Sequence, residues 1–239
     1  MANRPRMTAA AMTVATVAVA ALTACSGSAA PSQSGSSQSA AARPVAATIA
    51  GMKTAMRAAT SVHLTGSLSG SGGKTVGLDV GLTRSGRFAG TVAENGATLT
   101  IINAGGKVYI KATRAFLAQL NAPAAVCSLM CGKYVAMSPA QGDELAGQLN
   151  MVPLLQSITG RLPAFTNAGT QTINGQLAQV LHGADGSTLA VAATGQPYPV
   201  EAISPHNGHG SIGFSQWDSV PPPVAPPASQ VIDLSKLGG

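Results

Sequence analysis

From Ser61 onward, apolar and polar residues alternate along much of the chain, a period of two that is typical of strands burying one face. Turn dipeptides separate the alternating segments, and the Asn-Gly pairs at 95–96 and 174–175 are strong hairpin signals. The pattern predicts about ten short antiparallel strands, more than the roughly four to six of a usual open sheet. The expected strands are 62–67, 76–83, 87–93, 97–102, 107–112, 170–173, 176–181, 188–192, 200–204 and 211–217.

A sheet of many short antiparallel strands is expected to curve strongly. Glycines at strand positions such as Gly66, Gly81 and Gly90 fit this curvature, because glycine permits bends and bulges. The sequence therefore predicts an α+β fold that is mainly antiparallel β. Its centre is a strongly curved half-barrel sheet, with helices covering the concave face.

Three segments carry helical patterns. Apolar residues at helical spacing predict a helix over Val45–Thr60. A short helix is expected at Arg114–Leu120. An apolar stripe predicts a longer helix over Gln141–Ile158, kinked at Pro153 because proline removes a backbone hydrogen bond.

The N-terminus has the organisation of a secretion signal. Two arginines precede a charge-free apolar run over residues 8–24. The run ends in Leu22-Thr23-Ala24-Cys25, which resembles a bacterial lipobox. This order predicts a lipoprotein signal peptide at 1–24, acylation of Cys25, and a flexible Ser/Gly/Ala tether over 25–44.

Lipidation of Cys25 would fix the location of the protein. Two or more acyl chains anchor a protein stably, whereas one chain binds a membrane only marginally. The expected location is therefore the cell membrane, lipid-anchored on its extracytoplasmic face. An ordinary signal peptide or a short membrane anchor with a chance cysteine remains the alternative.

The charge of the chain gives little support to nucleic-acid binding. Of its 239 residues only 9% are charged and 3% are aromatic, and the formal net charge is +6. Two of the 14 basic residues lie in the expected signal peptide, and the others are scattered singly. Few aromatic side chains are available to stack on bases. We therefore expect a weakly basic, solvated surface and no nucleic-acid partner.

Four stretches carry a resemblance to a known family. They are Ser61-Val62-His63-Leu64-Thr65, Gly106-Lys107-Val108-Tyr109-Ile110, Thr172-Ile173-Asn174-Gly175-Gln176 and Phe214-Ser215-Gln216-Trp217. In their order and spacing, over about residues 45–224, the chain resembles the LppX/LprA/LprF/LprG family of actinobacterial lipoproteins, which is related in shape to the LolA/LolB lipid carriers. The resemblance implies a lipid-binding domain over 45–228, followed by a C-terminal tail over 229–239. The chain departs from the family pattern at Cys127 and Cys131 and in the long Pro-bearing tail.

The resemblance also implies an apolar cavity between sheet and helices that holds acylated lipids or glycolipids. Small apolar side chains at inward positions would leave room for acyl chains, whose burial is worth about 0.8 kcal/mol per CH₂. The alternative is a packed core, since core and cavity share one pattern. The candidate lining residues are Leu99, Ile101, Val108, Ile110, Leu145, Leu149 and Val152.

The cysteine pair is expected to form a local disulfide. Cys127 and Cys131 belong to a protein expected to be exported, where thiols oxidise. A redox or metal role would need a CxxC motif or neighbouring histidines and acids. The closed ring is short, so the expected stabilisation is small.

No set of residues in the sequence indicates catalysis or metal binding. His206 and His209 could offer two ligands, but the third and fourth are missing. The G-x-G-x-x-G match at 208–213 precedes a strand pattern, so no helix N-terminus would face a pyrophosphate. No G-x-S-x-G elbow occurs, and the adjacent Asp143 and Glu144 fit a helix start. We expect no enzyme, no cofactor and no metal.

These observations favour a membrane-anchored lipoprotein that binds acylated lipids or glycolipids and hands them over within the cell envelope. We expect a monomer with a lipid ligand and an envelope transporter as its partner. The alternative is a non-enzymatic scaffold or accessory lipoprotein with a solid core. An envelope hydrolase is the third hypothesis, and it lacks a catalytic set.

Overall fold

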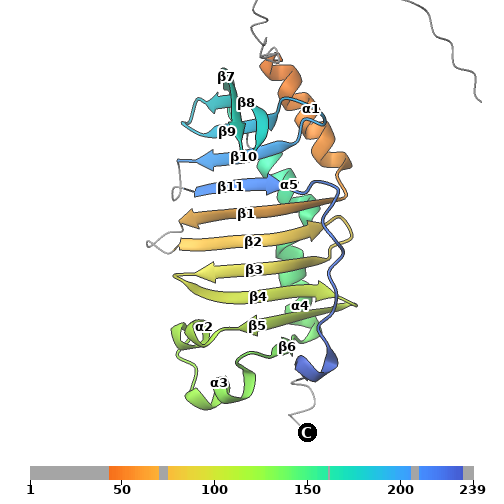
Figure 1. The fold of residues 1–239 in the computed structure, drawn as a ribbon, viewed down its shortest axis with the longest axis vertical. Helices are drawn as coiled ribbons and strands as arrows, with labels where there is room; N and C mark the ends of the chain where they lie inside the picture. Colours follow the sequence, from red (N-terminus) through yellow and green to blue (C-terminus); the bar gives the residue numbers. More distant parts are fainter. Residues whose placement is uncertain (1–42, 70–74, 161, 206–209, 234–239) are drawn as a thin grey trace, which may run out of the picture. The chain divides into compact units, whose positions relative to one another are not determined.

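The computed structural model describes residues 43–69, 75–160, 162–205 and 210–233. Within these residues the chain forms one twelve-stranded sheet with the order β12-β6-β5-β4-β3-β2-β1-β11-β10-β9-β8-β7 (Figure 1). All neighbours pair antiparallel except β12, which joins β6 in parallel. The strands are β1 (Ser61–Ser69), β2 (Thr75–Thr83), β3 (Phe88–Glu94), β4 (Ala97–Ala104), β5 (Lys107–Ala112), β6 (Tyr134–Ala136), β7 (Phe165–Ile173), β8 (Gln176–Gly183), β9 (Thr188–Ala192), β10 (Pro199–Ser204), β11 (Gly210–Ser215) and β12 (Val231–Asp233).

The mainly antiparallel α+β prediction is confirmed. The ten expected strands are present, and the two additional ones, β6 and β12, have three residues each. Such short segments are too brief for a period of two to stand out. β12 lies in the segment expected as a tail, and it makes one edge of the sheet.

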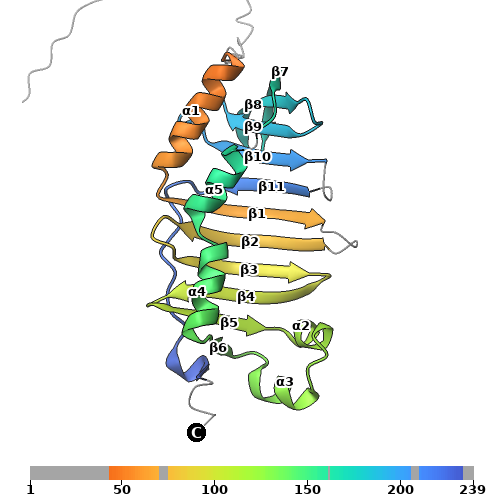
Figure 2. The same cartoon turned by 180° about the vertical axis from the view of Figure 1, so that it is seen from behind.

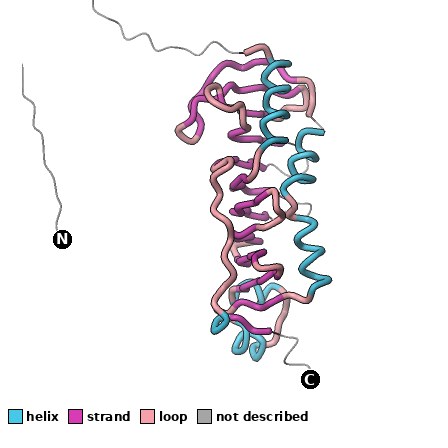
Figure 3. Tube along the Cα trace, turned by 90° about the vertical axis from the view of Figure 1, so that its right-hand side faces the viewer, coloured by secondary structure: helices cyan, strands magenta, loops and turns pink. Residues whose placement is uncertain are grey.

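Three helices lie along one face of the sheet (Figures 2 and 3). They are α1 (Val45–Ala58), α4 (Pro139–Gln148) and α5 (Met151–Gly160). The shorter α2 (Arg114–Gln119) and α3 (Ala124–Met130) follow β5. Thr113 starts α2, because its hydroxyl accepts the N–H of Phe116 at 3.2 Å.

The prediction of a helix kink at Pro153 is wrong. The chain breaks earlier, between α4 and α5, and the side chain of Asn150 accepts the N–H of Val152 at 3.1 Å. Pro153 then falls in the first turn of α5, where an N–H has no helical partner to lose. The proline therefore belongs to a helix start and not to a kink.

The main core lies between the sheet and the helices. Met52 and Met56 of α1 and Met151 and Leu155 of α5 pack with side chains from one face of the strands. Phe88 is the largest fully buried side chain. Side chains on the helix-facing side of β1, such as Leu64, alternate with outward ones, as strand geometry requires.

Two strand glycines allow neighbouring strands to approach closely. A Cβ at Gly66 would collide with the carbonyl oxygen of Ser211, and one at Gly90 would collide with that of Asp79. Only glycine fits where a neighbouring backbone comes this near. These two positions are therefore fixed by packing of the sheet.

The segment after β11 runs along the sheet on the face opposite to the helices (Figure 3). Val220 packs against Gly81, and its N–H donates to the hydroxyl of Ser61 at 3.1 Å. This strap carries the chain from β11 to β12. None of the helices in the described ranges is both long and apolar enough to cross a membrane.

Two candidate ligand pockets

One pocket lies between α1, α5 and the turn after β2, and we call it the helix-side pocket. Its volume is about 460 Å³, within the roughly 300–1,000 Å³ of ligand sites. It is lined by Lys53, Met56, Arg57, Arg84, Met151, Val152, Leu155, Gln156 and Thr159. Met56, Met151 and Leu155 are at most 5% exposed, so the pocket reaches the hydrophobic core.

Three cations stand around this apolar floor. Lys53 and Arg57 occupy successive turns of α1, and Arg84 comes from the turn between β2 and β3. Arg84 is fixed by its donors, which reach the carbonyl oxygens of Ala59 (2.8 Å) and Arg57. No acidic residue lines the pocket among the described residues. The arrangement suits an amphipathic ligand with an apolar part and a negative charge.

The seven residues expected to line a cavity lie together but mostly fill the core. Ile101 and Val108 are buried in it, and Leu99, Ile110, Leu145 and Leu149 pack against it. Val152 alone among the seven lines the helix-side pocket. A larger lipid cavity at these positions stays a prediction.

A second pocket, the hairpin-side pocket, has a volume of about 570 Å³. It lies partly on the sheet face away from the helices, since Thr65 and Gly213 alternate with the core residues Leu64 and Phe214. The turn between β7 and β8 and the loop between β9 and β10 complete it. Its lining is Thr65, Asn174, Gln176, Thr194, Gly195, Gln196, Tyr198, Val200, Gly213, Phe214, Ser215, Gln216 and Trp217.

An aromatic stack forms one wall of the hairpin-side pocket. The rings of Tyr198 and Trp217 are 4.4 Å apart and nearly parallel, and Phe214 follows at 6.1 Å from Trp217. The indole N–H of Trp217 donates to the carbonyl oxygen of Pro199 at 3.1 Å. The Tyr198 hydroxyl donates to Asp218 at 2.6 Å.

The pKa values of Tyr198 and Asp218 are both shifted, by burial and by the neighbouring groups. Burial, the hydrogen bond to Asp218 and its negative charge raise the pKa of Tyr198 to about 12. Burial alone would raise the pKa of Asp218, but hydrogen bonds from Thr60 and Tyr198 and the charge of Arg84 outweigh it and lower that pKa. Tyr198 is thus a neutral phenol at neutral pH.

The sheet also brings a serine, a histidine and an aspartate together. His63 Nε2 lies 2.7 Å from Asp79 Oδ1, and His63 Nδ1 lies 3.3 Å from the hydroxyl of Ser215. Ser215 lines the hairpin-side pocket. A hydrolase triad holds its aspartate buried, whereas the side chain of Asp79 is 64% exposed. We interpret the group as a surface network that orients the Ser215 hydroxyl.

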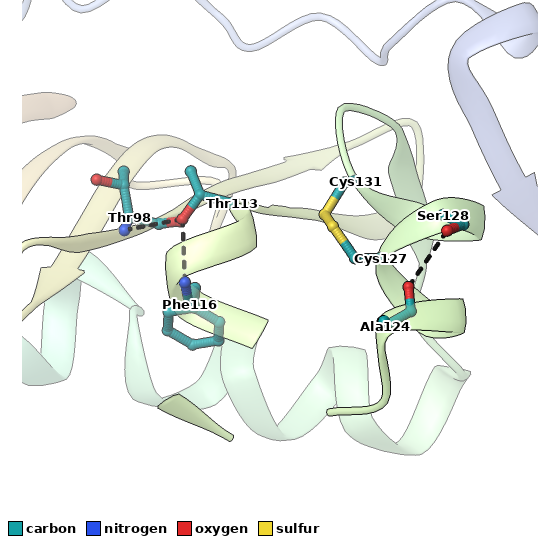
Figure 4. The surroundings of a disulfide bond; sticks show 7 residues. All are labelled: Thr98, Thr113, Phe116, Ala124, Cys127, Ser128 and Cys131. Atoms are coloured by element: carbon teal, nitrogen blue, oxygen red, sulfur yellow. Dashed lines mark hydrogen bonds between the residues drawn. A yellow bond between two sulfur atoms is a disulfide. The ribbon is translucent and has the colours of Figure 1, made fainter. Parts of the chain in front are cut away.

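The two cysteines are joined in the structure at the end of α3 (Figure 4). Their Cα atoms are 4.7 Å apart, within the usual range for a disulfide. Neither cysteine lines either pocket. The bond closes one turn of helix far from both candidate sites.

Several sequence expectations fall elsewhere. Cys25, His206 and His209 lie outside the described residues. Within the described ranges, no three His, Cys, Asp or Glu side chains form a group that could hold a metal. The stacked Tyr198 and Trp217 and the cation trio were missed, because each set joins segments distant in sequence.

Comparison of the fold with solved structures gives clear matches. LprF from Mycobacterium bovis aligns with a TM-score of 0.54 at 15% identity, over 75% of this chain and 95% of LprF. LppX from Mycobacterium tuberculosis aligns with a TM-score of 0.46 at 16% identity, over 74% and 98%. No family model and no curated protein matches the sequence. The match to LprF thus confirms the fold that the resemblance implied.

Proposed function

We propose that the protein is a membrane-anchored lipoprotein that binds an acylated lipid or glycolipid and hands it over within the cell envelope. The observation that carries the proposal is the helix-side pocket, with its apolar floor and three cations. The fold shared with LprF supports it.

The pocket divides an amphipathic ligand into two parts. An acyl chain would lie against Met56, Met151, Val152 and Leu155, where each buried CH₂ contributes about 0.8 kcal/mol. A negative head group would lie toward the cations, where charge-assisted hydrogen bonds are the strong ones. Binding needs no covalent chemistry, which agrees with a non-enzymatic carrier.

The anchor is proposed to be Cys25. Mass spectrometry of the mature N-terminal peptide should find a diacylglyceryl group on this residue. In a Cys25→Ala protein the modification should be lost and the protein should leave the membrane fraction. An unmodified N-terminal peptide beginning elsewhere would contradict the anchor while leaving the pocket untouched.

The lipid proposal is tested with the Cys25→Ala protein, which carries no acyl chain of its own. Organic extraction followed by mass spectrometry should recover acylated lipids at a fixed ratio to protein. Protein that is empty on purification and takes up no lipid in vitro would contradict the proposal. It would favour a scaffold with a solid core.

A further inference from the structure

The hairpin-side pocket has a lining that differs from that of a lipid site. Its polar residues are all uncharged: two threonines, one serine, one asparagine and three glutamines. No Asp, Glu, Lys, Arg or His stands among its described lining residues. A charged ligand would lose hydration there without gaining a partner, whereas hydroxyl groups would find both donors and acceptors.

The aromatic wall adds an apolar surface to this polar rim. The polar atoms of Tyr198 and Trp217 are already paired with Asp218 and Pro199. The two rings cover each other where they stack, so what they offer a ligand is the ring surface left outside the stack. The C–H groups of a sugar ring carry a slight positive charge and pack on the electron-rich ring surface, while its hydroxyls point outward.

The pocket is built from four separate parts of the sheet. The amide of Asn174, at the turn between β7 and β8, approaches Gly213 on β11: its nitrogen lies 4.0 Å from where a Cβ would be. The hydroxyl oxygen of Thr65, on β1, lies 3.1 Å from the same Cβ position. Since Gly213 has no side chain, the space between these two polar groups stays open. The volume of about 570 Å³ is that of a small-molecule site.

We propose that the hairpin-side pocket binds a neutral saccharide. The ring of the sugar packs beside Tyr198 and Trp217, and its hydroxyls bond to Asn174, Gln196 and Ser215. The sugar is either part of a free envelope glycan or the head group of a glycolipid. This inference rests on a pocket separate from the one that carries the lipid proposal.

The test uses Trp217, the single tryptophan of the chain, as a reporter inside the pocket. The Cys25→Ala protein is titrated with neutral trisaccharides of glucose and mannose, followed by tryptophan emission. We expect a saturable change with at least one of them and none with glucose 6-phosphate. No saturable response to any neutral saccharide would overturn the proposal.

Two matched variants locate the response. Asn174→Gly removes the amide at a left-handed position (φ 51°), and Asn95→Gly makes the same change at the turn between β3 and β4 (φ 48°). Glycine adopts this φ freely, so both variants should fold. Asn174→Gly should weaken saccharide binding about fivefold or more, the loss of one or two hydrogen bonds. Equal affinity in both variants would contradict the proposed site.

A comparison of the affinities for a free trisaccharide and for a glycolipid identifies the source of the sugar. A free trisaccharide that binds as tightly as a glycolipid with the same head group indicates an envelope glycan. A glycolipid that binds at least tenfold more tightly indicates a head group. If a lipid without any sugar produces the same emission change, the pocket is not a saccharide site and the proposal fails, whatever the result at the helix-side pocket.

Discussion

The helix-side pocket and the hairpin-side pocket are both built on the same sheet, but their lining residues differ in charge and polarity. The first has an apolar floor and three cations, Lys53, Arg57 and Arg84. The second has neutral amides and hydroxyls around an aromatic stack. The difference follows from the period of two in the strands. Side chains on one face of β1 and β11 pack in the core, whereas those on the other face lie outside it and can be polar.

Each of the two linings suits a different class of ligand. A long apolar chain needs access to the core, and the gap between α1 and α5 provides it. A sugar needs many hydrogen-bonding groups and one flat apolar wall, which loop and hairpin residues supply. Variants that affect both pockets, or only one, therefore test whether the two pockets bind their ligands independently.

The largest effect is expected for Phe214→Ala, because Phe214 belongs both to the main core and to the hairpin-side pocket. Its side chain is 4% exposed, it packs in the main core, and it lines the hairpin-side pocket. Removing a buried phenylalanine costs about 3–5 kcal/mol. Urea denaturation should show this loss, and saccharide binding should weaken as well. A change below about 1 kcal/mol would contradict the role of Phe214 in the core.

Charge reversal at Lys53 should separate the pockets. Lys53→Glu places a carboxylate beside the apolar floor of the helix-side pocket. Affinity for a fluorescent phosphatidylglycerol should fall about tenfold at low salt and less at high salt, because ions screen the charge. Saccharide titration of Trp217 should be unchanged. Lys107→Glu, at an exposed residue outside both pockets, is the control.

A smaller effect is expected for Asp218→Asn. The pKa of Asp218 is lowered in the folded protein, so its contribution to stability is full above the unfolded value near 3.8 and is lost as pH falls through the folded value. Since the carboxyl is largely exposed, we expect about 0.5–1 kcal/mol at neutral pH. Unfolding midpoints of both proteins should converge in acid. A difference that persists there would rule out the carboxylate as its cause.

The same variant should act on Tyr198. The raised pKa of about 12 favours the folded state below pH 10.0 and loses that effect as pH rises through 12. Without the charge of Asp218, the tyrosinate absorbance should titrate at lower pH. An unchanged titration would mean that burial alone shifts the pKa.

The smallest effect is expected when Ser215 is tested as a catalytic nucleophile, because we expect no reaction. If the contact of Ser215 with His63 only orients the hydroxyl, a fluorophosphonate probe should not label the protein. Ester substrates should show no turnover above a Ser215→Ala control. Labelling of wild-type protein that is lost in Ser215→Ala would revive the hydrolase hypothesis.

Local signals account for the parts of the fold that sequence reasoning predicts well. The Asn-Gly turn at 174–175 and the alternation of β2 depend on neighbouring residues only. β6 and β12 pair although nearly a hundred residues separate them in the sequence, so no local pattern predicts them. The position of Pro153 is ambiguous from sequence, because a proline can kink one helix or begin another.

The pockets could be predicted only in part. Val152 is the single cavity candidate that lines one, since Ile101 and Val108 carry the same apolar pattern whether they pack or leave space. The charged rim of the helix-side pocket joins α1 to the turn after β2. The aromatic stack joins the loop after β9 to the end of β11. Such meetings depend on the tertiary fold.

The most direct test of the lipid proposal is the molar ratio of acylated lipid to protein in purified Cys25→Ala protein, with and without Val152→Trp. The indole would fill the helix-side pocket, whereas Leu129→Trp adds the same group at a residue 51% exposed and outside both pockets. The proposal predicts a constant ratio in the parent and in Leu129→Trp, and at least a tenfold loss in Val152→Trp, with all three folded. Equal lipid content in the three proteins, or none in any of them, would contradict it.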